Sequence, residues 1–286
     1  MTVIEVIQRS AEFLAKKGVE SPRLQVELLL AHVLAMPRMK LYLNFERVLV
    51  DKELEHLREL VKRRGNREPL QHIIGTTNFC GLEFSVNRHV LIPRPETEIL
   101  AERAWRFLQQ RPDKAQKTCA LDFGTGSGCL AVMLAVKCPT SEIHAVDISS
   151  ESLKVARENA SRHNVDERIK FHYGDGFSAL GGEEKFDLIV ANPPYIPSEE
   201  IPTLEPEVRD HDPTLALDGG ADGLDFYQLF SGQAQNWLAA DGCLMLEFGE
   251  GQAEKIGGIF EEQKWVVEAI EHDYTQRLRF LIARQK

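Results

Sequence analysis

The sequence has little that suits a nucleic acid, a membrane or a disulfide framework. Its 44 Asp and Glu residues outnumber 34 Lys and Arg, and the net charge of −10 is the opposite of the cationic surface that duplex nucleic acid requires. The five cysteines form no C-x-x-C pair, which indicates free thiols in a reducing compartment. We expect no signal peptide and no membrane span. The composition predicts a cytoplasmic monomer with a protein or small-molecule partner, no bound metal and no stable nucleic-acid binding.

Three regions of different periodicity follow one another along the chain. Residues 1–68 carry apolar side chains at helical spacing and predict a small helical bundle. Residues 69–92 change to the alternation of a strand and predict a β-hairpin linker. From residue 93 to 286, near-continuous apolar strands alternate with amphipathic helices such as 151–164 and 226–240. That pattern predicts an α/β domain with a parallel sheet covered on both faces.

The end of the third region narrows the fold class. Its predicted strands are 119–124, 142–148, 169–175, 186–194, 242–249, 265–272 and 277–285. The last two strands are separated by only four residues, "DYTQ", so they should form an antiparallel hairpin at one edge of the sheet. Seven strands with this ending are typical of the class I, Rossmann-like methyltransferase fold.

Polar and glycine residues follow three successive predicted strands. The first strand ends in "LDFGTGSG", whose Gly124, Gly126 and Gly128 lack the spacing of pyrophosphate-binding loops. Asp147 ends the second strand, where a carboxylate can accept both hydroxyls of a ribose, and Asp175 follows the third, within reach of an adenine amino group. Because open α/β sheets bind ligands at the carboxyl edge of their strands, these features predict an adenosine site without phosphates. That ligand is S-adenosylmethionine.

The fourth strand ends in "NPPY", beside the expected position of the sulfonium methyl group. Pro193 and Pro194 donate no N–H and hold the backbone rigid, so their region offers carbonyl acceptors. Asn192 adds a side-chain acceptor, and Tyr195 offers a flat face for stacking. Two acceptors would grip both hydrogens of a planar NH₂ group and turn its lone pair toward the methyl group. We therefore expect methyl transfer to an amide or adenine nitrogen without a general base.

The motif alone does not separate an amide from adenine. The acidic charge disfavours a DNA substrate. The single basic cluster, "KRRGNR" (62–67), is interpreted as a solvated helix end, with contact to RNA or to a partner's acidic face as the alternative. The long acidic, proline-rich segment 195–213 is expected to close over the substrate.

Five segments together resemble the release factor glutamine methyltransferase family, also called PrmC or HemK. They are "VLIPRPETE" (90–98), "LDFGTGSG" (121–128), "NPPY" (192–195), "LEPEVRDHDPTLALDGGADGLDFY" (204–227) and "LEFGEGQ" (246–252), in the order of the family. The resemblance covers essentially the whole chain. It implies methylation of the glutamine side-chain amide in the Gly-Gly-Gln loop of bacterial peptide chain release factors, with S-adenosylhomocysteine as the second product.

The resemblance also implies roles for individual residues. The residues expected to bind S-adenosylmethionine are Gly124, Thr125, Gly126, Ser127, Gly128, Asp147, Asp175, Gly176 and Asn192. Those expected to hold the target glutamine are Asn192, Pro193, Pro194 and Tyr195, with Asn192, Pro193 and Tyr195 as the catalytic set. The "PRPETE" segment should pack over the cofactor, and the N-terminal bundle should bind the release factor.

The chain departs from the family pattern at two positions in the cofactor region, where Gly176 replaces a larger apolar residue and Phe123 replaces leucine. The second change is expected to affect only the core. A sister family that methylates a glutamine of a ribosomal protein is the closest alternative, and an adenine-N6 methyltransferase is a more distant one. A non-catalytic S-adenosylmethionine sensor would keep the glycine loop but would have no need for Asn192 and its prolines.

Overall fold

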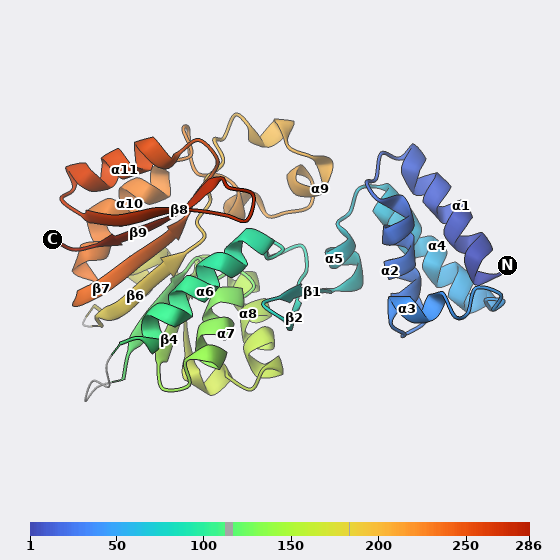
Figure 1. Cartoon of the computed structure of the whole chain (residues 1–286), viewed down its shortest axis with the longest axis horizontal. Coiled ribbons are helices and arrows are strands. Elements are labelled where there is room, and N and C mark those ends of the chain that lie inside the picture. Colours follow the sequence, from blue (N-terminus) through green and yellow to red (C-terminus); the bar gives the residue numbers. More distant parts are fainter. Residues whose placement is uncertain (112–116, 183) are drawn as a thin grey trace. The chain divides into compact units, whose positions relative to one another are not determined.

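The computed structural model describes residues 1–111, 117–182 and 184–286. They form two compact units: the first comprises residues 1–76 and 204–211, and the second comprises 77–203 and 212–286 (Figure 1). In this described part of the chain, no helix combines the length and apolar character needed to span a membrane.

The first unit is helical. Its helices are α1 (Val3–Lys16), α2 (Pro22–Val33), α3 (Arg38–Leu41), α4 (Asp51–Gly65), α5 (Leu70–Ile74) and α9 (Pro206–Arg209). Helix α1 begins with a reciprocal cap, because the Thr2 hydroxyl accepts from the Glu5 amide and the Glu5 carboxylate accepts from the Thr2 amide. Apolar residues of α1, α2 and α4, such as Leu14, Leu30 and Leu57, are buried together in its core.

The linker expected over 69–92 is shorter than predicted. Residues Leu70–Ile74 form α5 instead of extended chain, and Gly75, with φ of 85°, ends that helix in the left-handed conformation. The hairpin itself consists of β1 (Thr76–Phe79) and β2 (Leu82–Ser85). Cys80 and Gly81 between them both have positive φ, as a two-residue hairpin turn of type I′ requires.

Segment 204–211 lies within the helical unit although it is far from it in sequence. Its Glu207 accepts from Arg64 Nη2 at 2.8 Å and from Arg67 Nε and Nη2 at 2.6 Å each. The Arg64 side chain is only 6% exposed, and Glu205 adds a second carboxylate beside Arg67. Arg64 and Arg67 of the basic cluster 62–67 therefore bind an acidic segment of their own chain, which differs from the expected solvated helix end.

The second unit contains a seven-stranded sheet in the order β5-β4-β3-β6-β7-β9-β8. The strands are β3 (Cys119–Phe123), β4 (Glu142–Asp147), β5 (Ile169–Tyr173), β6 (Phe186–Ala191), β7 (Leu238–Glu247), β8 (Val266–His272) and β9 (Leu278–Arg284). The first five are parallel, and β9 runs antiparallel to both β7 and β8. The predicted fold class and its terminal hairpin are confirmed.

Helices cover both faces of this sheet (Figure 1). Leu188 and Val190 of β6 face the core formed with α6 (Pro95–Gln109), α7 (Cys129–Lys137) and part of α8 (Ser150–Arg162). The alternate residues Ile189 and Ala191 face the core formed with α10 (Asp225–Gln233) and α11 (Ala253–Glu262). The helix predicted over 226–240 ends earlier because β7 already begins at Leu238, which pairs with Phe186.

Candidate active site

A cavity of about 430 Å³ lies in the second unit, at the carboxyl ends of the parallel strands. Residues that follow β3, β4 and β6 line it, together with the start of α6 and the segment 213–220. Strand β3 lies between β4 and β6, so the chain order of the sheet reverses there. Such reversals open a crevice between the loops of adjacent strands, which is where doubly wound sheets bind ligands.

The glycine loop after β3 forms one wall of the cavity. Gly124 and Gly126 have φ of 71° and 53°, and a Cβ atom on either would meet almost nothing but open space. Their backbone is therefore exposed to a ligand at close range. Gly128 has a different role, because it does not line the cavity and a Cβ atom there would lie 3.0 Å from the Cβ of Ala156 on α8.

Asp147 ends β4 and binds this loop directly. Its Oδ2 accepts from the Gly126 amide at 2.8 Å, and its Oδ1 accepts from the Ser149 amide at 2.8 Å. Burial raises the pKa of Asp147, and the two backbone hydrogen bonds oppose that shift. Each carboxylate oxygen keeps further lone pairs for a ligand, so both can still accept ribose hydroxyls.

A second buried carboxylate lies behind the loop. Asp122 Oδ2 accepts from the Thr125 hydroxyl at 2.6 Å and from the Ala131 amide at 3.0 Å. Burial raises the pKa of Asp122 to about 7. The residue joins the loop to the first turn of α7, and its position in the buried strand β3 gave no signal of this role in the sequence.

The two departures from the family pattern in the cofactor region lie against each other. A Cβ atom on Gly176 would lie 2.7 Å from the ring of Phe123, and Phe123 itself lines the cavity. The aromatic ring thus occupies the space that a side chain at position 176 would need. Phe123 therefore forms part of the ligand wall, whereas the sequence predicted an effect on the core alone.

Asn192 follows β6 and is one of the residues that line the cavity. Its Nδ2 donates to Thr97 Oγ1 at 3.0 Å, and that hydroxyl donates to Glu247 Oε2 at 2.8 Å. Thr97 and Glu247 are each 2% exposed. Because the amide nitrogen is occupied by Thr97, the Asn192 oxygen is left as an acceptor for a ligand.

Tyr195 lies outside the cavity lining, unlike Asn192, Pro193 and Pro194. Its ring packs 3.0 Å from where a Cβ atom of Gly249 would be, and burial raises the pKa of its phenol to about 12. Its carbonyl accepts from Gln252 Nε2 at 2.9 Å. Sequence reasoning expected the Tyr195 ring to stack on the substrate, and the structure places the ring against the "LEFGEGQ" segment.

The glycines of "LDGGADGLD" allow the chain to approach the "NPPY" backbone. A Cβ atom on Gly219 would lie 2.9 Å from the Pro194 carbonyl, and one on Gly223 would lie 2.4 Å from the Tyr195 carbonyl. The neighbouring residues also pair, since the Ile196 amide donates to the Leu217 carbonyl at 3.0 Å. Any side chain at these glycines would displace the "NPPY" backbone.

The cavity brings together most of the residues that the sequence singled out. Those that line it are Gly124, Thr125, Gly126, Ser127, Asp147, Asp175, Gly176, Asn192, Pro193 and Pro194. Residues that the sequence did not single out individually also line it, namely Arg94, Thr97, Asp122 and Asp225. Arg94 also donates to Asp212 at 2.8 Å, which joins the "PRPETE" segment to the returning end of the long acidic segment.

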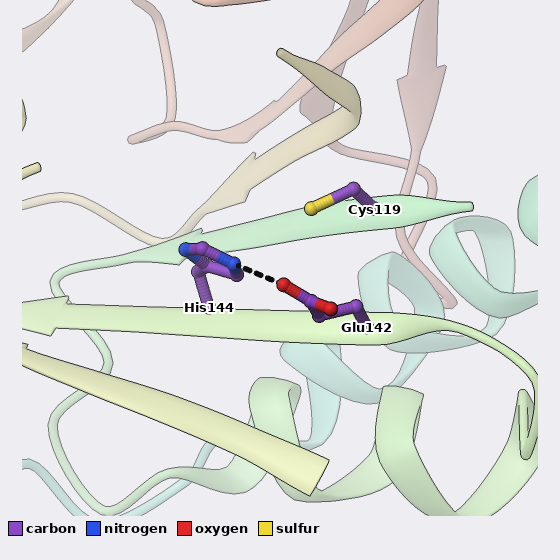
Figure 2. Close-up of side chains that lie close together, drawn as sticks. All are labelled: Cys119, Glu142 and His144. Carbon is purple, nitrogen blue, oxygen red and sulfur yellow. Dashed lines mark hydrogen bonds and ion pairs between the residues drawn. The ribbon is translucent and has the colours of Figure 1, made fainter. Parts of the chain in front are cut away.

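Another group of polar side chains lies at the amino-terminal ends of the strands. Cys119 begins β3, and Glu142 and His144 lie on the adjacent β4 (Figure 2). Within the described residues, these three are the group whose possible metal-ligand atoms all lie within 4.8 Å of one another. His144 Nε2 and the Lys170 ammonium are already 3.0 and 2.5 Å from Glu142 Oε1. Because Glu142 already has these two partners, we assign no metal to this group.

The fold and the cavity define the class of the protein. The protein has the class I methyltransferase fold. Its seven-stranded sheet has the β7-β9-β8 ending, a glycine loop follows the central strand β3, and an acidic residue follows β4. Sequence comparison narrows this class. Residues 5–75 match the family model for the PrmC N-terminal domain, and residues 102–204 match that for the methyltransferase small domain.

Two curated relatives cover most of the chain. The release factor glutamine methyltransferase of Geobacter sulfurreducens is 46% identical over 91% of this chain and 88% of its own length. That of Chlorobaculum tepidum is 44% identical over 88% of this chain and 87% of its own length. The chain belongs to the release factor glutamine methyltransferase family, as its five sequence motifs predicted.

Solved structures support the fold at low sequence identity. A 16S rRNA methyltransferase of T. thermophilus, solved with AdoMet and guanosine, has a TM-score of 0.51 and 19% identity, covering 74% of this chain and 50% of its own. A human methyltransferase 10 domain containing protein has a TM-score of 0.50 and 16% identity, covering 72% of this chain and 90% of its own.

Proposed function

We propose that this protein transfers a methyl group from S-adenosylmethionine to the side-chain amide nitrogen of the glutamine in the Gly-Gly-Gln loop of bacterial peptide chain release factors. The observation that carries the proposal is the Asn192 amide, held with its oxygen free at a cavity that also presents a glycine loop and Asp147. Membership of the family supports the choice of substrate.

The cavity walls divide into a cofactor part and a substrate part. The backbone of Gly124 and Gly126 would contact the amino-acid end of S-adenosylmethionine, and Asp147 would accept its ribose hydroxyls. Asp175, with Gly176 and the Phe123 ring, would border the adenine. When bound, the cofactor supplies an electrophilic methyl group on a positively charged sulfur.

The substrate part holds a planar amide. Asn192 Oδ1 and a backbone carbonyl of the following proline turn would each accept one hydrogen of the glutamine NH₂. Two such hydrogen bonds would favour a pyramidal nitrogen, whose lone pair is then available for attack, and the methylated nitrogen would release one of its two hydrogens as a proton to solvent. Pro193 and Pro194 keep this turn rigid, and Gln252 fixes the Tyr195 carbonyl at its end. We assign Tyr195 to the catalytic set through its place in this turn.

The runner-up substrates fit the chain less well. An adenine in DNA or RNA would require a basic approach to the cavity, but Arg64 and Arg67 of the basic cluster are paired with Glu207. A glutamine of a ribosomal protein would use the same acceptors, and the family assignment favours a release factor over it. The expected setting is a monomer in the cytoplasm, where its five free cysteines would stay reduced.

The N-terminal bundle (residues 1–68) is proposed to bind the release factor away from the reacting glutamine. Segment 39–50 carries five exposed large apolar side chains, those of Met39, Tyr42, Leu43, Val48 and Val50. Leu43 is 84% exposed, the most of any large apolar residue in the described chain. Apolar side chains that protrude from a small bundle in this way are typical of contacts with another protein.

Leu43→Asp should weaken release-factor binding without affecting the chemistry. We expect KM for the release factor to rise about 10-fold, because an apolar contact is replaced by a charge. The affinity for S-adenosylhomocysteine and the kcat value should stay unchanged. Val266→Asp, an equally polar change at an exposed valine of β8, is the matched control. An unchanged KM for Leu43→Asp would show that the bundle binds the substrate through another surface.

The substrate assignment is tested by labelling. The protein is incubated with labelled S-adenosylmethionine and, separately, with release factor, ribosomal protein and DNA, and the modified residue is mapped by mass spectrometry. We expect label on the release factor glutamine and none on a release factor whose Gly-Gly-Gln glutamine is replaced by alanine. Label on ribosomal protein or DNA alone would overturn the proposed function.

A further inference from the structure

Three side chains from distant parts of the sequence form one hydrogen-bonded row that begins at the wall of the cavity. Asn192 follows β6, Thr97 lies in the first turn of α6, and Glu247 ends β7. The two hydrogen bonds measure 3.0 Å between Asn192 Nδ2 and Thr97 Oγ1, and 2.8 Å between Thr97 Oγ1 and Glu247 Oε2. Of the three, only Asn192 is partly exposed.

The direction of this row follows from counting hydrogens. An ionised carboxylate only accepts, so Glu247 takes the single hydroxyl hydrogen of Thr97. The Thr97 oxygen then has lone pairs and no hydrogen to offer Asn192, and the only favourable amide group to face it is the NH₂. An inverted Asn192 amide would place two oxygens 3.0 Å apart with no hydrogen between them.

This direction matters for the chemistry. A side-chain amide can rotate so that its oxygen and nitrogen exchange places at little steric cost. An inverted Asn192 would present N–H groups to the target NH₂, and two donors cannot share a hydrogen bond. Catalysis of the proposed kind therefore requires something to select one of the two amide orientations.

We propose that Thr97 and Glu247 are positioning residues that hold the Asn192 amide with its oxygen toward the substrate nitrogen. This inference rests on the proposed function, because it assigns Asn192 the role of acceptor. Neither residue needs to touch the substrate, since both act through Asn192. Their burial excludes the water that would otherwise satisfy the amide in either orientation.

Protonation of Glu247 would allow the hydrogen bonds of this row to reverse their direction. The charged and titratable groups that act on it come from four neighbouring segments: Arg94 and Glu96 at the start of α6, Arg279 of β9, Tyr195 and Tyr227. Burial raises the pKa of Glu247 to about 7, opposed by the Thr97 hydrogen bond and by Arg279. A protonated Glu247 can donate to Thr97, which frees the Thr97 hydrogen for an inverted Asn192.

The expected pH dependence separates positioning from stability. Because Glu247 must be ionised to select the amide orientation, kcat should fall as the pH decreases through about 7. Stability should change in the opposite sense. A carboxyl whose folded pKa is raised contributes stability that is fully present below its unfolded pKa and is lost as the pH rises through the folded value. If Glu247 had a purely structural role, activity would not fall at the low pH values at which its protonation makes the fold more stable.

Three variants test the proposal by kcat at saturating cofactor and substrate from pH 6 to 9. Thr97→Val removes both hydrogen bonds and should lower kcat about 10- to 100-fold, as loss of an orienting partner commonly does. Thr97→Ser keeps the hydroxyl and should retain most of the activity. Glu247→Gln should lower kcat and abolish its fall between pH 8 and 6. Ser231→Ala, which removes a buried hydroxyl bonded to the Gln228 carbonyl, is the control for stability alone.

A second measurement does not depend on activity. The side-chain amide protons of Asn192, observed by NMR, should shift with pH around 7 in the wild-type protein and lose that dependence in Thr97→Val and Glu247→Gln. If folded Thr97→Val keeps the wild-type kcat, or if the Asn192 signals do not respond to Glu247, the positioning role is wrong. If the NMR response is present but no release factor is methylated, the proposed function fails while the hydrogen-bonded row stands.

Discussion

Asn192→Ala should reduce kcat for release-factor methylation by about 10²- to 10³-fold, the effect commonly seen when one preorganised hydrogen-bond partner of a reacting group is removed. The alanine side chain cannot accept from the glutamine NH₂, so the nitrogen stays planar and its lone pair stays delocalised. The affinity for S-adenosylhomocysteine should change little, because Asp147 and the glycine loop remain. Single-turnover kinetics and calorimetry measure the two quantities.

The control for this variant is Asn236→Ala, which removes an exposed asparagine outside the cavity lining. It should leave both kcat and cofactor affinity unchanged. Asn192→Asp is also informative, because its carboxylate would face the Thr97 oxygen without a hydrogen between them. We expect it to be nearly as inactive as the alanine variant. Wild-type rates in Asn192→Ala would show that the backbone carbonyls alone activate the amide.

Asp147→Ala should raise the Kd for S-adenosylhomocysteine about 100-fold or more. Hydrogen bonds to a charged group contribute roughly 1.5–3 kcal/mol each, and the variant loses two acceptors for the ribose. It also releases the Gly126 and Ser149 amides, which Asp147 holds at 2.8 Å in the folded protein. The loop that we propose to contact the cofactor would therefore lose its fixed shape as well.

Asp147→Asn separates these two contributions, since an asparagine keeps one acceptor oxygen and lacks the charge. We expect its Kd to lie between those of the wild-type and alanine proteins in isothermal titration calorimetry. A cofactor Kd in Asp147→Ala equal to that of the wild-type protein would mean that the adenosine lies elsewhere in the cavity. Circular dichroism distinguishes such a result from misfolding.

The sequence predicted the parts of the site that follow from one rule, namely that open parallel sheets bind ligands at the carboxyl ends of their strands. Strand ends are visible as apolar runs that stop at polar or glycine residues, and the ends of β3, β4 and β6 were located in this way. Thr97 and Glu247 could not be found by the same reasoning. Thr97 has the appearance of an ordinary residue in the first turn of a helix, and Glu247 is separated from it by 150 positions.

The helical unit was also predicted only in part. The apolar spacing of α1, α2 and α4 is a local signal, but the pairing of Arg64 with Glu207 spans 143 positions. Acidic residues are numerous in this chain, and nothing in the spacing of segment 204–211 indicates which cations it meets. The proximity of Phe123 and Gly176 could not be predicted from the sequence either. The two residues are 53 positions apart, and only the fold shows that the Phe123 ring occupies the space that a side chain at position 176 would need.

The inserted segment 204–211 has a consequence for biosynthesis. Ribosomes add roughly 5–20 residues per second, so Glu207 is made many seconds after Arg64. During that interval the bundle can bury its apolar residues, but the guanidinium groups of Arg64 and Arg67 have not yet met their carboxylate. The amino-terminal unit of this protein is therefore completed only after β6 and Asn192 have been synthesised. A gene fragment that encodes residues 1–76 alone would specify a bundle in which Arg64 keeps its hydrogen bonds to Gln25 and to the Glu68 carbonyl but lacks the Glu207 carboxylate.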